Sequence, residues 1–449
     1  MKTLYSNATI VNEDRCFRGW LLTDSERIAA LGEGEAPDGL GADCLRDCSG
    51  LYLLPGVIDV HVHFRDPGLT EKGDIATESH AAVAGGVTSY FDMPNTRPAT
   101  VTVADVEAKM ERARSVSEAN YAFFIGATDS NLPQLLEADY SHIPGIKLFM
   151  GSSTGNMLVD SVSALDRLFA EAPAIIAVHA EDEAINRAAR ERLTAAHPEG
   201  VPVELHPEMR PREACVEATR RAIALAERHG ARLHVCHVST AEELTLIAEA
   251  KLRGVKVTAE TAPQYLLWDS ADFLRLGARI KCNPSIKTAA DRIALLRALR
   301  RGGPIDLIAT DHAPHLPGQK QGDALTATSG MPMVQFSLPA MLDLVANDAE
   351  CEGLTVADVV RLMCHAPADV FGIIDRGYLR PGAYADLTLV ERLPLHQAHT
   401  VTDGDVLSRC GWTPLAGHTL TWRVVDTIVG GGAGPQPLTF DNNKNTLLY

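Results

Sequence analysis

Short apolar runs alternate with amphipathic segments through the middle of the chain. Eight runs have the composition of buried β-strands. Between most of them, apolar residues recur every three or four positions, as they do on one face of a helix. The expected strands end near His63, Met93, Ala127, Met150, His179, His237, Glu260 and Asp311, and the expected helices include 104–116, 163–171, 213–229, 241–253 and 289–301.

This alternation predicts an α/β fold, a (β/α)8 barrel of the TIM type. Right-handed crossovers between parallel strands close such a sheet on itself. Catalytic sites in these barrels lie at the carboxyl ends of the strands. We expect the barrel to occupy residues 55–375.

Both ends of the chain carry short β-like segments bounded by Gly, Asp, Asn or Pro. Residues 1–54 contain Thr9–Val11, and residues 376–449 contain Ala385–Val390 and Arg423–Val429. Neither set is large enough to enclose a core alone. Because chain termini often lie close together, we expect one small β domain assembled from both ends.

The amino-acid composition excludes several kinds of protein. The net charge is −17, whereas binding of nucleic acid or an anionic membrane calls for clustered Lys and Arg. Nine cysteines without regular spacing predict reduced thiols and no disulfide framework. The sequence has neither a signal-peptide pattern nor an apolar run of about 18 residues. We therefore expect a cytoplasmic enzyme that acts on a small-molecule substrate.

The chemistry begins with His61 and His63 at the end of the first barrel strand. In an extended strand these two imidazoles point the same way, about 7 Å apart at their Cα atoms, and can hold one metal ion. The alternative is a pair of polar residues at a solvated strand tip. The preceding Val57, Ile58 and Val60 favour a buried strand instead.

Four further strands carry side chains that suit a metal site: Lys147, His179, His237 and Asp311. Each alone is weak evidence, but a barrel brings the strand ends together around one mouth. Imidazole and carboxylate ligands suit zinc, and the lack of a Cys among them favours an open, catalytic site.

Lys147 is unusual in this set, because an ammonium group repels a cation. A neutral amine can add carbon dioxide and become a carbamate, whose two oxygens resemble a carboxylate. Such a group can bridge two metals about 3.5–4 Å apart, and a water shared between them becomes the nucleophile. The alternative for Lys147 is a salt bridge to Asp311 or Glu181.

Five motifs carry a resemblance to a known family. They are His61-Val-His-Phe-Arg-Asp-Pro-Gly68, Phe91-Asp-Met-Pro-Asn-Thr96, Lys147-Leu-Phe-Met-Gly-Ser-Ser153, Lys281-Cys-Asn-Pro284 and Asp311-His-Ala-Pro-His315. From Leu54 to Pro414 the chain resembles the dihydroorotases of the amidohydrolase superfamily. Arg65 together with Met93–Thr96 is the most specific part of the match.

The resemblance implies two Zn²⁺ ions and the reversible cyclisation of N-carbamoyl-L-aspartate to L-dihydroorotate, in pyrimidine biosynthesis, by a bridging hydroxide. It also implies a homodimer and an association with aspartate transcarbamoylase. The implied ligands are His61 and His63 for the more buried metal, His179 and His237 for the more exposed one, carbamylated Lys147 as the bridge, and Asp311 as both ligand and proton shuttle.

The resemblance assigns Arg65, Asn95, Asn283 and His315 to the substrate's side carboxylate and ring amide. A guanidinium and side-chain amides recognise a carboxylate with fixed geometry. The alternatives are a surface ion pair for Arg65, turn positions for the two asparagines, and a cap or loop position for His315.

Three segments show where the sequence agrees with this family and where it differs from it. Some relatives replace the bridging lysine by an Asp after the fourth strand, but residues 151–156 contain none, which favours Lys147. Pro263-Gln264-Tyr265 stands where many relatives carry paired His. Leu316–Gly330 lacks a helical pattern, and it is expected to form either a lid over the site or an inert surface loop.

Two other functions compete with the first. The chain could be another cyclic amidohydrolase, a dihydropyrimidinase (hydantoinase) or an allantoinase, but Arg65 argues against substrates that lack the side carboxylate. It could also be a non-catalytic, dihydroorotase-like partner of aspartate transcarbamoylase. Such proteins lose metal ligands, and this sequence retains all six.

Overall fold

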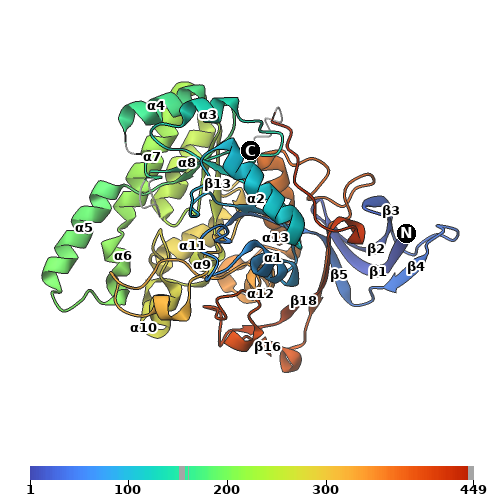
Figure 1. The fold of residues 1–449 in the computed structure, drawn as a ribbon. Helices are drawn as coiled ribbons and strands as arrows, with labels where there is room; N and C mark the ends of the chain where they lie inside the picture. The colour runs from blue at the N-terminus through green and yellow to red at the C-terminus, as the bar shows by residue number, and fades with distance from the viewer. Residues whose placement is uncertain (151–156, 160, 443–449) are drawn as a thin grey trace.

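The computed structural model describes residues 1–150, 157–159 and 161–442. Helices surround a central barrel of strands, and a separate sheet formed by the N-terminal segment lies to one side (Figure 1). The described helices include none with the length and apolarity needed to span a bilayer. All nine cysteines are unpaired.

Parallel strands form the barrel, and their positions agree with the eight expected runs. The third of these runs is broken at Phe124 into two short strands. In chain order the strands are β6 (Val57–Val62), β7 (Val87–Asp92), β8 (Asn120–Phe123), β9 (Ile125–Gly126), β10 (Ile146–Phe149), β11 (Ile176–His179), β12 (Leu233–Val235), β13 (Val257–Thr261) and β14 (Leu307–Ile308).

Two sheets and one bridge close the ring. β6, β7 and β8 form one sheet, and β9 to β14 form the other in sequence order. The ring closes where Val62 at the end of β6 pairs in parallel with His312, beyond β14, and the His63 N–H donates to the His312 carbonyl over 2.7 Å. The predicted barrel is therefore confirmed.

Helices follow the strands as the periodicity predicts. Several begin with a capping box, in which a side chain before the first turn accepts a backbone N–H and the third helical residue returns the bond; Thr102 with Asp105 is one example. The helices are α1 (Ile75–Ala84), α2 (Val103–Val116), α3 (Leu132–Glu137), α4 (Val162–Glu171), α5 (Glu183–Ala196), α6 (His206–Met209), α7 (Arg212–His229), α8 (Ala241–Leu252), α9 (Pro263–Leu267), α10 (Phe273–Leu276), α11 (Ala289–Ala298), α12 (Ser337–Asn347), α13 (Val356–Val360) and α14 (Ala366–Phe371).

The sheet beside the barrel combines both ends of the chain, as expected. Its central path runs β18-β15-β5-β1-β2-β3, and β4 pairs with β1. In Figure 1 the blue N-terminal strands meet the red strand β18 here. The members are β1 (Lys2–Asn12), β2 (Arg15–Asp24), β3 (Arg27–Glu33), β4 (Cys44–Asp47), β5 (Leu51–Pro55), β15 (Leu387–Arg392) and β18 (Trp422–Ile428), while β16 (His399–Thr400) and β17 (Thr419–Leu420) pair separately.

An apolar cluster fills the barrel below the site. Side chains from several strands meet there, including Phe91 of β7. Phe371 at the end of α14 and Phe440 close the cluster from the amino-terminal side of the strands, with ring centroids 5.1 and 5.6 Å from Phe91. The barrel is thus a packed core with its opening at the other end, where functional residues are expected.

Candidate metal centre

One cavity of about 190 Å³ at the carboxyl ends of the strands receives every side chain that the sequence predicts for the site. The structure therefore brings together residues spread over 255 positions of the chain, although their roles as ligands or substrate contacts stay predictions. These residues are His61, His63, Arg65, Asn95, Lys147, His179, His237, Asn283, Asp311 and His315.

The first group of candidate ligands is His61, His63 and Asp311. Asp311 Oδ1 lies 3.3 Å from His61 Nε2 and 3.0 Å from His63 Nε2. The opposite ring nitrogens are already engaged, because His61 Nδ1 pairs with Glu260 and His63 Nδ1 lies 2.7 Å from Asn95 Oδ1. The oxygen partner at each Nδ1 fixes the orientation of the ring, so both imidazoles direct Nε2 towards Asp311.

His179 and His237 form the second group. His179 Nδ1 faces His237 Nε2 at 2.8 Å, and His179 Nε2 bonds to Glu181 Oε2 at 2.9 Å. Arg210 holds Glu181 through a two-pronged ion pair. The Glu181 carboxylate thus orients His179 as Glu260 orients His61, and a ring centroid distance of 5.4 Å between His61 and His237 joins the two groups.

Lys147 lies in the wall of the cavity with its side chain fully buried. Its Nζ lies 3.0 Å from Cys236 Sγ, and among the described residues it forms no ion pair. The alternative of a salt bridge to Asp311 or Glu181 is therefore wrong in this structure. A buried ammonium without a counter-charge is costly, which favours a chemical form of Lys147 that is not cationic.

Burial and neighbouring charges set the protonation of the first group. Burial alone would raise the pKa of Asp311, but the adjoining His61 and His63 hold it below its ordinary value. Burial, the largest single effect, opposes the charged form of His61, but the Glu260 and Asp311 carboxylates and the hydrogen bond to Cys236 together raise the pKa of His61 to about 10. Burial lowers the pKa of His63 to about 4. Asp311 is therefore an anion that can bind a cation or accept a proton.

Three residues of the site have a left-handed backbone that side chains rarely adopt. The φ angles are 69° at Arg65, 40° at His237 and 50° at Asp311. Such conformations cost on the order of 1–3 kcal/mol each and persist where the surrounding structure determines them. Here they turn the chain just beyond a strand end, so that each side chain enters the cavity.

Arg65 is buried, with only 5 % of its surface exposed. Its Nε donates to the Pro314 carbonyl over 3.2 Å, and an Nη lies 3.2 Å from His315 Nε2. The alternative of a surface ion pair is therefore wrong. Asn283 and His315 also face the cavity, whereas the Asn95 oxygen orients His63, a contact that the sequence did not predict.

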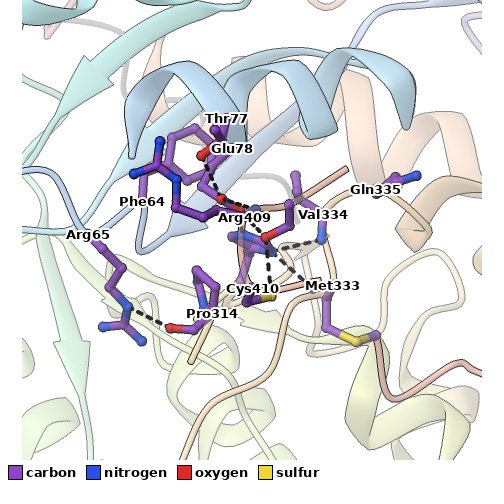
Figure 2. A network of polar contacts seen from close by, with 12 residues as sticks. Phe64, Arg65, Thr77, Glu78, Pro314, Met333, Val334, Gln335, Arg409 and Cys410 are labelled. Atoms are coloured by element: carbon purple, nitrogen blue, oxygen red, sulfur yellow. Dashed lines mark hydrogen bonds and ion pairs between the residues drawn. The ribbon is translucent and has the colours of Figure 1, made fainter. Parts of the chain in front are cut away.

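Behind Asp311, a polar network fixes the strand end. His312 Nδ1 accepts the backbone N–H groups of Met333 and Val334, at 3.0 and 3.2 Å, so its proton is on Nε2 and is donated to Glu78 over 2.8 Å. Glu78 on α1 also accepts the Arg409 N–H at 3.0 Å. Figure 2 shows this network together with the Arg65–Pro314 bond. Glu78 and the Met333–Val334 segment thus hold His312, the residue next to Asp311, and Arg409 in turn holds Glu78.

The structure adds three carboxylates that sequence reasoning did not assign to the site: Glu78, Glu181 and Glu260. All three are buried and bond to an imidazole of the site or of its support. The signal for Glu260 was its position at an expected strand end, and Glu181 follows His179 by two residues. Glu78 lies in a helix, where nothing in the sequence distinguishes it from a surface carboxylate.

The structure describes two of the three segments that were compared with the family in the sequence. Gln264 and Tyr265 lie outside the lining of the cavity, and the Tyr265 hydroxyl donates to the Pro284 carbonyl over 2.8 Å, next to Asn283. Leu316–Gly330 passes beside the cavity, which Ser329 and Gly330 line, so it is not an inert surface loop. The loop 151–156 lies outside the described residues.

These donors fit divalent metal ions. The ligand atoms of His61, His63 and Asp311 lie within 4.8 Å of one another, and the facing nitrogens of His179 and His237 offer a second set. His237 Nδ1 is buried without a hydrogen-bond partner among the described residues. Imidazole and carboxylate donors at an open strand-end cavity are typical of catalytic metal sites.

The barrel and this cluster of side chains define a metal-dependent hydrolase of the kind that carries its site at the strand ends. Residues 52–432 match the amidohydrolase family. The chain belongs to this family, and the expected class, a metal-dependent cyclic amide hydrolase, is confirmed.

Known relatives divide among several activities. A dihydroorotase of Lactobacillus johnsonii is 32 % identical over 440 residues, covering 96 % of this chain and 98 % of the relative. An allantoinase of Bacillus velezensis is 33 % identical over 411 residues, covering 90 % of this chain and 87 % of the relative. The L-hydantoinase structure from Arthrobacter aurescens superposes with a TM-score of 0.89 at 28 % identity, covering 99 % of this chain and 97 % of that structure. The fold and class follow from these matches, and the choice of substrate depends on the site.

Proposed function

We propose that this protein is a dihydroorotase, which interconverts N-carbamoyl-L-aspartate and L-dihydroorotate in pyrimidine biosynthesis. One observation carries the proposal: the buried guanidinium of Arg65 reaches the cavity that also holds the candidate ligands. Dihydroorotate bears a carboxylate on its ring, whereas hydantoin and allantoin bear none. A buried cation facing a substrate cavity favours the substrate with the carboxylate.

The metal would be zinc, two ions per chain, held by His61, His63, His179, His237, Asp311 and Lys147 in its carbamylated form. When bound, such ions polarise the amide carbonyl and lower the pKa of a water molecule. The carbamate assignment is supported by the burial of Lys147 without a carboxylate partner among the described residues.

Asp311 is the group that would move the proton. Its Oδ1 lies at the meeting point of His61 and His63, and its depressed pKa keeps it an anion that can take a proton from a nucleophile. Once protonated, it can deliver that proton to the ring nitrogen that leaves when the amide opens. In the cyclisation direction the same carboxylate would remove the proton from the attacking carbamoyl nitrogen.

Arg65 and His315 would hold the ring carboxylate, with Asn283 on the ring amide and Asn95 shared between substrate and His63. Burial, with help from Arg65, lowers the pKa of His315 to about 2, so this imidazole stays neutral near pH 7. A neutral imidazole has a single N–H donor, which lies on the Ser329 carbonyl in this structure and would turn from it to reach the carboxylate.

The proposal is tested by assaying the zinc-loaded enzyme with dihydroorotate, hydantoin and allantoin. We expect turnover of dihydroorotate to exceed that of the other two by at least a hundredfold in kcat/KM. In Arg65→Lys the Michaelis constant should rise for dihydroorotate and for carbamoyl aspartate, while the zinc content stays the same. Two bound zinc ions with no turnover of dihydroorotate would contradict the proposal and favour an allantoinase or hydantoinase.

A second experiment addresses Lys147. Metal-free enzyme is prepared in acid, freed of carbon dioxide and reloaded with zinc, with or without bicarbonate. We expect activity to return only with bicarbonate, and we expect Lys147→Ala to remain inactive in both conditions. Equal recovery without bicarbonate, or an active Lys147→Ala protein, would exclude a bridging carbamate.

Other expectations from the sequence stay predictions. They are the cytoplasmic location, the homodimer and the association with aspartate transcarbamoylase. A non-catalytic partner role is disfavoured by the convergence of all six candidate ligands in one cavity.

A further inference from the structure

Two cations line the cavity with no carboxylate within ion-pair distance of either among the described residues. Arg65 is buried and Lys72 is half-buried, and neither forms an ion pair within the described part of the chain. Other enclosed cations, such as Lys109 and Arg376, are paired with carboxylates, while Lys320 beside the cavity is held by backbone carbonyls. Buried charges normally find a counter-charge, so the pair implies an anion that comes from outside the chain.

A single imidazole separates the two cations. His315 Nε2 lies 3.2 Å from an Arg65 Nη, and His315 Nδ1 lies 3.4 Å from Lys72 Nζ. The His315 ring also bonds to the Ser329 carbonyl through Nε2 at 2.9 Å. A carbonyl can only accept and an ammonium can only donate, so Nε2 carries the proton and Nδ1 receives the Lys72 ammonium.

In this tautomer His315 cannot accept a hydrogen bond from Arg65, although the two side chains face each other. The Arg65 guanidinium faces a protonated Nε2 and therefore cannot donate to it, so that part of its fork is free to bind an oxygen. Lys72 has three N–H donors, of which His315 accepts one. Both sets of donors, on either side of His315, belong to residues that line the same cavity.

We propose that Lys72 is a substrate-binding residue, and that Lys72, Arg65 and His315 together form the site that selects ring substrates bearing a carboxylate. This inference rests on the proposed function and names a residue for its substrate specificity. Arg65 would offer a planar pair of donors to the carboxylate, and Lys72 would add a compact second charge. A neutral ring would leave both cations without a counter-charge, which weakens binding of such substrates.

The chain segment around Lys72 suits this role. Lys72 lies in the turn between Arg65 and α1, where its N–H donates to the Leu69 carbonyl over 3.0 Å and the Leu69 N–H donates to the Arg65 carbonyl over 3.1 Å. Backbone hydrogen bonds thus fix Lys72 relative to Arg65. Within the described residues the side chain of Lys72 makes no hydrogen bond or ion pair besides the bond to His315, so replacing it should leave the barrel intact.

The test compares Lys72→Met, Lys72→Arg and the wild type, all loaded with zinc, and uses two rings that differ only in the carboxylate: dihydroorotate and 5,6-dihydrouracil. We expect Lys72→Met to raise the Michaelis constant for dihydroorotate at least tenfold, with kcat changed less than threefold. Lys72→Arg should recover most of this loss. For 5,6-dihydrouracil, the Michaelis constant as a substrate or the inhibition constant as a competitive inhibitor should be unchanged or lower.

The matched control is Lys256→Met, which removes an exposed lysine far along the chain. A Michaelis constant for dihydroorotate that is the same in Lys72→Met and wild type would overturn the role of Lys72. An equal weakening of 5,6-dihydrouracil would also overturn it, because the effect would not depend on the carboxylate. If the wild type itself does not turn over dihydroorotate, the proposed function is wrong, and that outcome is distinct from the first two.

Discussion

Glu260 determines which nitrogen of His61 faces the metal site. It also accepts from His234 Nε2 at 3.0 Å and from the His237 N–H at 3.3 Å, so one buried carboxylate connects β12 with β13 beneath both groups of candidate ligands. Burial would raise the pKa of Glu260, but His61 and His234 hold it well below its ordinary value. It is therefore an anion that strengthens the imidazole as a ligand.

Replacing this charge tests its effect on the metal. We expect Glu260→Gln to weaken zinc binding about 10- to 100-fold, because the neutral amide no longer fixes the His61 tautomer or raises its basicity. Competition with a chelator measures the zinc affinity, and circular dichroism verifies the fold. Glu242→Gln, on the exposed face of α8, is the control. Equal zinc affinity in both variants would remove Glu260 from the support of the site.

Among single residues, the sequence was most informative for side chains in a barrel strand or just beyond its carboxyl end. His61, Lys147 and Asp311 could be predicted because parallel strands place their ends around one mouth. The bond between Asn95 and His63, and the network that joins Glu78 with His312, could not be predicted. They depend on how a loop or a helix packs against the barrel, which local patterns do not encode.

Among the elements, the segment Leu316–Gly330 is held against the site by a buried lysine. Lys320 Nζ donates to the carbonyls of Lys281, Thr328 and Gly330 at 2.9, 2.8 and 2.7 Å. Burial lowers the pKa of Lys320 to about 7. Because the Thr328 and Gly330 carbonyls flank Ser329, whose own carbonyl accepts from His315, Lys320 indirectly positions the substrate side of the cavity.

We expect Lys320→Met to loosen this segment while leaving the metal centre intact. The Thr328 and Gly330 carbonyls would lose the Lys320 donor, at a cost of about 1–3 kcal/mol for each one left unsatisfied in the interior, whereas the Lys281 carbonyl keeps the Gly330 N–H. Amide hydrogen exchange should accelerate at least tenfold in 325–330, and the Michaelis constant should rise several-fold at constant zinc content. Unchanged exchange, relative to Lys256→Met, would show that the segment is anchored by other contacts.

Long helices were predicted better than irregular segments. The periodicity located helices such as α2 and α7 to within one residue, because both combine a long apolar stripe with clear boundaries. The segment 316–330 gave no pattern, since its structure depends on Lys320 and on single buried alanines such as Ala324. A buried lysine in a polar, glycine-rich stretch looks like a surface residue in the sequence.

For the whole molecule, buried neutral histidines imply sensitivity to acid. His206 is completely buried, neither ring nitrogen has a hydrogen-bond partner among the described residues, and burial with nearby cations lowers its pKa well below the ordinary value. The unfolded chain binds a proton at this residue near pH 6.5, while the folded chain does not. Stability is therefore full above pH 6.5 and declines as the pH falls below it.

His206→Phe should remove part of this decline. Relative to the variant, we expect the wild type to lose about 1.4 kcal/mol of unfolding free energy for each pH unit below 6.5. Urea denaturation at pH 7.5, 6.5 and 5.5 measures the difference between the two proteins. A difference that does not change with pH would mean that His206 is protonated in the folded state.

The closure of the barrel by Phe371 and Phe440 has a consequence for how the protein is made. Phe440 pairs through the backbone with Ile373, and Pro437 pairs with Tyr121 of β8, more than 300 residues earlier. As the chain leaves the ribosome, the apolar interior that includes Phe91 and Phe124 stays uncovered until these late residues arrive. The unfinished barrel therefore leaves apolar surface uncovered at its base until the last residues are made, and we expect chains that stop short of Phe440 to aggregate.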